Sequence, residues 1–519
     1  MPTERRSTTR RTRASGVVAG LALLAAACSG GGDDVPVDGE ESGGDGDGGG
    51  TFIAAISAQP DQFDPHQTTA YASFQVLENV YDTLVVPDPE DLTYQPSLAT
   101  EWETSEDGLT WTFTLRDDVT FHDGSEFDSA DVVYSFRRII DEELQNAYRF
   151  AAVTDITAPD ATTVEFTLSE PTPNLLDHVG SYKGVAILPE GAADDLDLAT
   201  EANGTGPFEL GGMSAGGVTL TAFDDYWDEG PLVDEVEFQF ISEPTTALTS
   251  LETGEIHWTD NIPPQRVEEL AESDSITVED VPSVDYWYMA TNFAKPPFDQ
   301  PEVREAIALA LDREAIADAA QFGLAAVNQT AIPEESFWFH DYAPYERDVD
   351  AAQDLLDEAG VSDLTMGLMV TDEYPETVEV AQVIASNLEE IGITVDIQTE
   401  QFSTWLDRQG AGDFDAFMLG WLGNLDPYGY YHSQHVCEGE NNYQGYCDPE
   451  TDELLNEAAT EPDEDARKAL YDEAAERIVD ANSYIYFYNP SVVQGWGGDV
   501  EGYELRADRA INFETVSLS

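Results

Sequence analysis

Residues 364–398 read LTMGLMVTDEYPETVEVAQVIASNLEEIGITVDIQ, and this stretch decides the fold class. Residues 364–370 form an apolar run of strand length, residues 378–391 carry apolar side chains at helical spacing, and residues 393–398 form a second short strand. A helix between two such strands is typical of a β-α-β unit, whose strands lie parallel. We therefore predict an α/β fold with a parallel sheet in this part of the chain.

Similar patterns extend in both directions from this unit. Residues 70–86 and 303–320 each have apolar side chains spaced for one helix face, which predicts one continuous helix in each range. Residues 109–115 alternate polar and apolar side chains, as a strand with one buried face does. Another helix is expected to start at Ser129, with its hydroxyl as the cap and Asp131 near the positive end of the helix.

The charge of the chain excludes one class of partner. The 519 residues include 105 Asp and Glu but only 21 Lys and Arg, giving a formal net charge of −84. Such a protein repels the phosphate backbone of nucleic acids. With 41% apolar residues the chain can still form sizeable cores. We predict a protein from a salt-adapted organism, because salt screens the repulsion between carboxylates; an acidic exported protein from an ordinary environment is the alternative.

The N-terminal sequence MPTERRSTTRRTRASGVVAGLALLAAACSG, residues 1–30, predicts an export signal. Its apolar run, residues 17–27, is shorter than the roughly 20 residues that a membrane-spanning helix needs. Residues 24–30 resemble a bacterial lipobox, with Ala25 where Leu is usual, and this resemblance implies a lipid anchor on Cys28. An ordinary signal peptide with an incidental Cys is the alternative. The pair Arg10-Arg11 leaves open whether export follows the general or the twin-arginine route.

Residues 29–50 are rich in Gly and Asp and predict a disordered, self-repelling tether. Beyond Cys28 the only cysteines are Cys437 and Cys447. In an oxidising compartment these two predict one disulfide. A metal site with the nearby His432 and His435 is the competing interpretation, but zinc ligands usually include a more closely spaced Cys pair.

Several runs along the chain together resemble one family. They are Pro96-Ser97-Leu98-Ala99 with Trp102, residues 107–116 (DGLTWTFTLR), 121–124 (FHDG), 131–136 (DVVYSF), 204–208 (GTGPF), 292–316 (NFAKPPFDQPEVREAIALALDREAI), Gly420-Trp421 with Asp426-Pro427, and Tyr446 with residues 448–450 and 452–455. The chain resembles the oligopeptide/dipeptide-type (family 5) extracellular solute-binding proteins of ABC importers, whose members also carry nickel chelates, opines and some sugars. The resemblance runs, in order, from residue 52 to the end.

The resemblance implies a periplasmic-binding-protein-like, type II two-lobed clamp with an extra domain, the arrangement called cluster C. Placed by the element breaks, the expected organisation has seven parts. They are a lipoprotein signal peptide at 1–28, a tether at 29–50, lobe I at 51–95, 204–285 and 488–519, domain II at 96–203, and lobe III at 286–487. Two lobes that close over a solute and exclude water need no catalytic side chain.

The resemblance also implies candidate ligand contacts. In the peptide-binding members an Asp after the late Trp pairs with the ammonium group of the ligand, and here Asn424 stands at that place in WLGNLDP, residues 421–427. A neutral amide weakens such a contact, so either Asp426 takes over the role or the ligand is not a simple peptide. Trp421 and Trp287 are expected in the pocket, with Tyr286 beside them, although aromatic residues of this region also suit core packing.

Two weaker candidates lie in the loop after the first strand. Gln62 and Phe63 follow residues 52–56, and loops of this kind often face ligands. We therefore count both as possible ligand contacts.

An enzyme is the rival class. Residues 212–216, GMSAG, satisfy the Gly-x-Ser-x-Gly pattern of hydrolases. The pattern requires a strand before it and a helix after it, whereas residues 208–210 and 218–223 predict a hairpin. A surface protein that only adheres is a further rival, but such proteins usually contain repeats and this chain has none.

We therefore predict an extracytoplasmic, lipid-anchored receptor of an ABC importer. It would bind a peptide or a polar solute of similar size by lobe closure and deliver it unaltered to the permease subunits. A metal chelate, an opine or an oligosaccharide is the alternative ligand, and a secreted hydrolase is a distant alternative. We expect a monomer at the outer face of the cell membrane, with no cofactor, no metal and no nucleic-acid partner.

Overall fold

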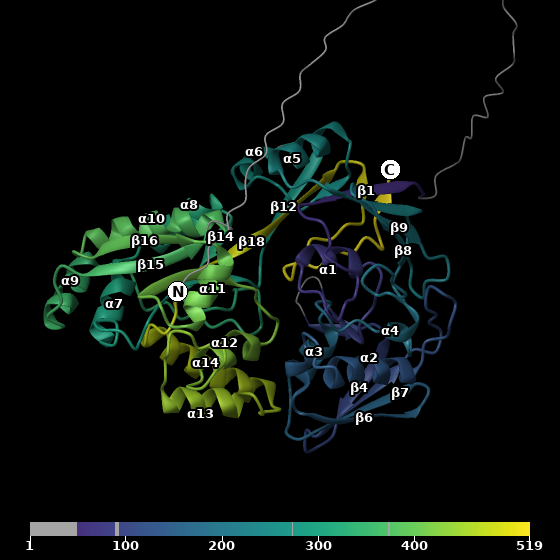
Figure 1. Cartoon of the computed structure of the whole chain (residues 1–519), viewed down its shortest axis with the longest axis horizontal. Helices are drawn as coiled ribbons and strands as arrows, with labels where there is room; N and C mark the ends of the chain where they lie inside the picture. The colour runs from purple at the N-terminus through teal and green to yellow at the C-terminus, as the bar shows by residue number, and fades with distance from the viewer. Residues whose placement is uncertain (1–48, 89–92, 272, 274, 372–373) are drawn as a thin grey trace, which may run out of the picture. The chain divides into compact units, whose positions relative to one another are not determined.

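The structure is a computed structural model that describes residues 49–88, 93–271, 273, 275–371 and 374–519. The predicted signal peptide, Cys28 and nearly all of the predicted tether lie outside these residues. The described part is built on one large sheet and a separate small sheet (Figure 1).

The large sheet has twelve strands. Ten follow one path, and β12 (Ile276–Pro282) and β14 (Ala325–Val327) also pair with β18. The path is β16 (Thr394–Glu400), β15 (Thr365–Thr371), β17 (Ala416–Trp421), β13 (Tyr286–Thr291), β18 (Ile485–Gly497), β11 (Trp258–Thr259), β1 (Thr51–Ile56), β10 (Glu235–Phe240), β9 (Gly217–Ala222) and β8 (Phe208–Met213). We use the name lobe III for the elements from β13 to α14 (Glu464–Asp480), and lobe I for β1, β8 to β12 and the segment that follows β18.

One long strand belongs to both lobes. β18 has 13 residues; its first part pairs with β13 and its last part pairs with β11 and β12. The second connection is the short segment 283–285, which joins β12 of lobe I to β13 of lobe III. The two lobes are therefore linked through these two neighbouring backbone crossings, where Ser283 N–H donates to the Pro490 carbonyl at 2.9 Å.

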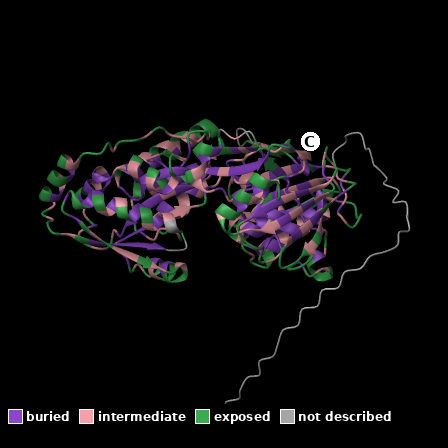
Figure 2. Cartoon of the chain, turned by 90° about the horizontal axis from the view of Figure 1, so that it is seen from above, coloured by how far each residue is buried: buried purple, intermediate pink, exposed green. Residues whose placement is uncertain are grey.

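Helices cover both faces of the sheet in lobe III. Alternate side chains of a strand point to opposite faces of the sheet, so neighbouring residues of β13 pack in two different cores. Met289 of β13 packs in a core with α7 (Pro301–Ala310), α8 (Arg313–Gln321), α9 (Val349–Glu358) and α10 (Pro375–Glu389). Tyr286 and Tyr288 pack in a second core with α11 (Phe402–Gly410), α12 (Pro427–His435), α13 (Pro449–Ala458) and α14 (Glu464–Asp480). Figure 2 shows the buried residues gathered inside these layers and the exposed ones at their outer edges.

Domain II has a small antiparallel sheet of its own. Its strand order is β4 (Ala99–Thr104), β5 (Thr110–Leu115), β7 (Thr163–Leu168) and β6 (Val153–Asp160). Helix α2 (Ser129–Asp141) packs on this sheet through Val132, Phe136 and Ile139, and α3 (Leu175–Gly180) joins the same core. This core is separate from those of the two lobes.

The remaining elements complete lobe I and the connections. The core of lobe I includes side chains from β1, β9 and β10 together with α1 (Tyr71–Leu77). The others are α4 (Ala192–Asp195), α5 (Pro244–Thr253), α6 (Val267–Leu270), β2 (Val85–Pro87), β3 (Tyr94–Pro96), β19 (Val500–Glu501), β20 (Ser517–Leu518), and the 3₁₀ turns Ala147–Phe150 and Pro264–Arg266.

The predicted β-α-β unit is confirmed. β15, α10 and β16 follow each other in the chain, and β15 pairs with β16 in parallel from Thr365↔Thr394 to Thr371↔Glu400. The hairpin predicted around residues 212–216 is also present, because β8 pairs with β9 antiparallel on either side of Ser214. Ser214 therefore lies in the turn of a hairpin. A hydrolase nucleophile would instead lie between a strand and a helix.

The single helix predicted for residues 70–86 is wrong. Helix α1 ends at Leu77, and β2 starts at Val85. Asn79 Nδ2 donates to the Gln75 carbonyl and to the Ile511 carbonyl, and the Asn79 carbonyl accepts the N–H of Phe208 at 3.1 Å. After Leu77, hydrogen bonds to backbone groups far away in the chain therefore replace the hydrogen bonds of a helix. Val80, Tyr81 and Leu84 are nevertheless buried, which explains why the apolar pattern of the sequence continues past the end of the helix.

The single helix predicted for residues 303–320 is also wrong. It is divided into α7 and α8, since Leu311 has an extended backbone and Asp312 caps α8 by accepting the Ala315 N–H at 3.0 Å. In α2 the start at Ser129 is confirmed but the cap is not the Ser129 hydroxyl. Asp128 accepts the Ala130 N–H at 2.7 Å, and Asp131 accepts the Asp128 N–H at 2.8 Å, which closes a capping box.

Candidate functional site

A cavity of about 900 Å³ lies between domain II and lobe III. Domain II lines it with residues around Tyr148 and His178, and lobe III lines it with Trp421, Asn424 and residues of α12 and the following loop. A volume of this size falls within the range of small-molecule sites in proteins. A second cavity of about 330 Å³ adjoins it, and Asn174, Asp177 and Asn424 line both.

Residues 421–426, from the last residue of β17 to the start of α12, contribute to both cavities. We call this segment the ligand loop. Trp421 is half-buried and lines the first cavity, and Asn424 is half-buried and lines both. Asn424 packs over Gly429 of α12, where an added Cβ would lie 2.4 Å from its Nδ2 atom. The predicted residues Trp421 and Asn424 are thus brought together at the cavity wall.

Asp426 ends the ligand loop, and its carboxylate is already occupied. It accepts the Tyr428 N–H at 2.9 Å and caps α12, and both oxygens accept from Arg467 at 2.7 Å. Asp426 is 8% exposed and Arg467 is 4% exposed. The structure therefore uses this carboxylate to hold α12 and α14 together. Asp426 also lines the second cavity, but its negative charge is paired with Arg467 and is not left for the ammonium group of a ligand.

Trp287 lies on a different face of lobe III from the first cavity. Its ring stacks with Tyr488 at a centroid distance of 6.3 Å and contacts Tyr374 edge-on at 6.5 Å. Gly420 lies under the ring, where an added Cβ would be 2.6 Å from it. Trp287 is half-buried and does not line either of the two cavities described above.

Three other predicted residues are also away from these cavities. Tyr286 and Phe63 are each 1% exposed and pack in the cores of lobe III and lobe I, respectively. Gln62 is half-buried beside Phe63. None of the three is among the residues that line the two cavities.

Domain II supplies one side of the first cavity, and none of its contributing residues was predicted from the sequence. Tyr148, Glu170 and His178 belong to three different elements, which are a 3₁₀ turn, a loop and a short helix, respectively. No motif marks them, because their only common property is the place to which the fold brings them. Arg149 is the one basic side chain among the residues lining this cavity, beside Asp177 and Glu170.

The two histidines at the cavity are neutral near pH 7. Burial lowers the pKa of His178 to about 3, and burial likewise lowers the pKa of His432. A neutral imidazole can both donate and accept a hydrogen bond. These residues therefore present polar atoms but no positive charge to a solute.

Large apolar side chains remain exposed around the two cavities. Tyr148 of domain II is 64% exposed, Phe337 of lobe III is 50% exposed, and Leu422 in the ligand loop is 62% exposed. Tyr148 lines the first cavity and Phe337 lines the second. Exposed apolar side chains gathered at one place often mark a binding surface.

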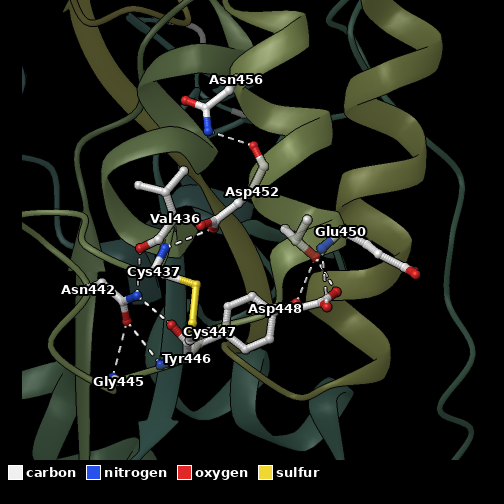
Figure 3. The surroundings of a disulfide bond; sticks show 11 residues. Val436, Cys437, Asn442, Gly445, Tyr446, Cys447, Asp448, Glu450, Asp452 and Asn456 are labelled. Carbon is white, nitrogen blue, oxygen red and sulfur yellow. Dashed lines mark hydrogen bonds between the residues drawn. A yellow bond between two sulfur atoms is a disulfide. The ribbon is translucent and has the colours of Figure 1, made fainter.

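The loop closed by Cys437 and Cys447 forms another wall of the first cavity. The two Sγ atoms are bonded, and Glu438, Gly439, Glu440 and Asn441 line the cavity. Figure 3 shows how the neighbouring side chains support this loop: Asp452 accepts the Cys437 N–H at 2.8 Å, and Asn442 Nδ2 donates to the Val436 and Tyr446 carbonyls.

The histidines near this loop have protein partners. His435 is buried and lies 2.9 Å from Ser483 Oγ and 3.1 Å from Tyr486 Oη, and His432 Nε2 lies 3.2 Å from Asn456 Oδ1. Within the described residues no group of three or more potential metal ligands comes together. No helix of that part of the chain is long and apolar enough to cross a membrane.

A two-lobed α/β fold with an extra domain, and a solute-sized cavity between its parts, define a binding protein. Residues 93–442 match the family model of bacterial extracellular solute-binding proteins, family 5, and the chain belongs to that family. The family is the non-enzymatic, substrate-binding component of ABC importers, and this chain has the type II clamp fold of its members.

The similarity to known proteins extends over nearly the whole length of this chain. The dipeptide-binding protein of Escherichia coli K12 is 26% identical over 509 residues, covering 90% of this chain and 94% of that protein. The structure of DppA from Helicobacter pylori in complex with the peptide STSA has a TM-score of 0.77 at 27% identity, covering 91% of this chain and 98% of that one. The structure of AgaA with agropinic acid, from A. tumefacien R10, has a TM-score of 0.76 at 26% identity, covering 91% and 99%.

Proposed function

We propose that this substrate-binding protein holds a peptide, or a polar solute of similar size, in the cavity between domain II and lobe III. The observation that carries the proposal is the cavity of about 900 Å³, which is lined from both sides by side chains that include the exposed Tyr148 of domain II and the half-buried Trp421 of lobe III. Movement of the two sides toward each other would bury these side chains and exclude water from the solute. Closure and delivery to the permease then follow from one motion, with the protein acting as a monomer.

The residues of the ligand loop favour a second candidate for the solute, namely a compound other than a simple peptide. Asn424 carries no charge, and both oxygens of Asp426 are bound by Arg467, so the loop offers no free carboxylate to an ammonium group. The similar protein AgaA was solved with agropinic acid. An opine, a chelate or an oligosaccharide therefore remains the alternative to a peptide.

The first experiment identifies the solute and locates its site. We expect mass spectrometry of the purified protein to detect a co-purifying polar solute, whose affinity is then measured by calorimetry after its removal. Trp421→Ala should weaken that affinity at least about 30-fold, which corresponds to about 2 kcal/mol, because a buried aromatic contact often dominates a binding site.

Trp102→Ala is the matched control. Trp102 is also half-buried but lies on β4, in the sheet of domain II, and it does not line either cavity. The affinity should stay unchanged in this variant. Equal affinities of wild type and Trp421→Ala would show that Trp421 does not contact the solute.

We also propose the domain boundaries that the sequence predicts. Lobe I comprises residues 51–95, 204–285 and 488–519, domain II comprises 96–203, and lobe III comprises 286–487. The grouping of the described strands supports this division, since β4 to β7 form one sheet and β13 to β17 lie together at one end of the other. Of the two remaining strand pairs, β19 with β20 lies within residues 488–519, and β2 with β3 lies where residues 51–95 meet domain II.

A lipid anchor on Cys28 is the proposed link to the membrane, with residues 29–50 as the tether. In cells that process lipoproteins, we expect the wild-type protein in the membrane fraction and Cys28→Ser in the soluble or secreted fraction, because the diacyl group supplies the attachment. Cys437→Ser, which keeps Cys28, is the control and should stay with the membrane. Membrane association of Cys28→Ser equal to that of wild type would contradict the anchor.

The protein is further proposed to be adapted to high salt. The net charge is −84, and many of the basic side chains that do occur are paired, as Arg347 is with Glu390 and Arg408 with Glu400, both at 2.7 Å. Most carboxylates therefore have no basic partner. Dissolved cations must screen their repulsion if the folded chain is to remain compact.

A further inference from the structure

Asp285 occupies the segment that joins β12 of lobe I to β13 of lobe III, and it is 5% exposed. Its two carboxylate oxygens bind groups on opposite sides of this connection. Oδ1 accepts the N–H of Gly423 at 3.0 Å, and Oδ2 accepts from Arg509 Nη2 at 2.9 Å. One buried carboxylate thus contacts both the ligand loop and the C-terminal segment.

The ligand loop fits tightly against this connection. An added Cβ on Gly423 would lie 1.6 Å from the Val284 carbonyl oxygen, so only glycine is accommodated. The Tyr430 hydroxyl of α12 donates to the same carbonyl at 2.8 Å. The position of Gly423, between Trp421 and Asn424, is therefore fixed by residues 284 and 285.

Arg509 is held firmly by lobe I. Its backbone has a φ of 65°, a left-handed conformation that is unfavourable for a residue with a Cβ. Its carbonyl accepts the hydroxyl of Tyr71 on α1 at 3.0 Å. The surrounding contacts therefore maintain an unfavourable backbone, and this backbone directs the guanidinium group to Asp285.

The ion pair stands at the crossing between the lobes. β18 makes the other crossing at Asn489, whose Nδ2 donates to the Asp285 carbonyl at 2.8 Å. A rotation of one lobe against the other must take place at these crossings, and there Asp285 binds lobe I through Arg509 and lobe III through Gly423. We propose that Asp285 and Arg509 are positioning residues that set the place of the ligand loop relative to lobe I.

This inference rests on the proposed function in one respect, namely that the ligand loop contacts the solute. Its mechanical part does not depend on any solute. Hydrogen exchange of residues 421–426 in the ligand-free protein therefore tests it separately from the binding experiments.

Arg509→Gln removes the ion pair and leaves the Gly423 contact of Asp285 possible. We expect amide exchange in residues 421–426 to become at least about tenfold faster, because the acceptor of the Gly423 N–H loses its second support. Asp285→Ala removes both contacts and should accelerate exchange further. Arg509→Lys keeps the positive charge and should restore much of the protection.

Arg506→Gln is the matched control, since Arg506 pairs with Asp508 at 2.8 Å in the same C-terminal segment but does not contact Asp285. Its exchange in residues 421–426 should equal that of wild type. Unchanged exchange in Arg509→Gln would overturn the inference, as would equal acceleration by Arg506→Gln. If Arg509→Gln does not fold, Asp285→Asn decides, because it removes the ion pair with Arg509 but keeps an oxygen that can accept the Gly423 N–H. Acceleration confined to residues 421–426 supports the coupling, and none or a uniform increase throughout the chain overturns it.

The affinity measurement separates the two proposals. Faster exchange in Arg509→Gln together with weaker binding of the co-purified solute supports the positioning role. Faster exchange with unchanged affinity overturns that role. Failure of the proposed function has a different signature, which is unchanged affinity in Trp421→Ala.

Discussion

Asp426→Ala is expected to lower the free energy of unfolding by about 3–5 kcal/mol, the cost of leaving one partner of a buried ion pair alone. Arg467 would keep its positive charge at 4% exposure without the two 2.7 Å contacts it now makes. The same substitution removes the cap of α12. Denaturant unfolding of the ligand-free protein, followed by circular dichroism, measures the change.

Asp448→Ala provides a matched control. Asp448 also caps a helix, α13, and also pairs with an arginine, Arg477, at 3.4 Å, but the two side chains are 30% and 33% exposed. We expect a loss of about 1–2 kcal/mol, from the cap and an exposed ion pair. Equal losses in the two variants would show that burial of the Asp426–Arg467 pair has no special weight.

Transfer from several molar to about 0.1 M NaCl is expected to remove most of the stability of the folded protein. The screening length is about 3 Å at 1 M salt and about 10 Å at 0.1 M, so at low salt many more carboxylates repel one another. We expect a free energy of unfolding near zero at about 0.1 M, and one within the usual 5–15 kcal/mol at several molar. Thermal and denaturant unfolding across a salt series measure this dependence.

Two controls separate screening from other effects of the solution. KCl at the same ionic strength should stabilise the protein as NaCl does, because screening depends on ionic strength. Sucrose strengthens the burial of apolar surface without screening charge, and it should replace little of the lost stability. Equal stability at 0.1 M and at several molar NaCl would refute salt adaptation.

The candidate site could be predicted only in part. Trp421 and Asn424 follow from a motif of seven residues, 421–427, and the structure places both at the cavity. Asp426 lies in the same motif, but its partner Arg467 is 41 residues away, and nothing in the motif indicates that both carboxylate oxygens are already bound. Tyr148 and His178 of domain II carry no sequence signal, because they meet lobe III only through the fold.

Features with local causes could be predicted from the sequence alone. The β15-α10-β16 unit follows from periodicity within 35 residues, the charge of −84 follows from composition, and the family follows from motifs in a fixed order. The end of α1 at Leu77 depends on tertiary contacts, because Asn79 bonds with Phe208 and Ile511 instead of continuing the helix. Tertiary contacts also determine which buried carboxylate holds which loop. Such contacts join residues that are 41 to 432 positions apart in the chain, and only packing of the whole chain brings them within hydrogen-bonding distance.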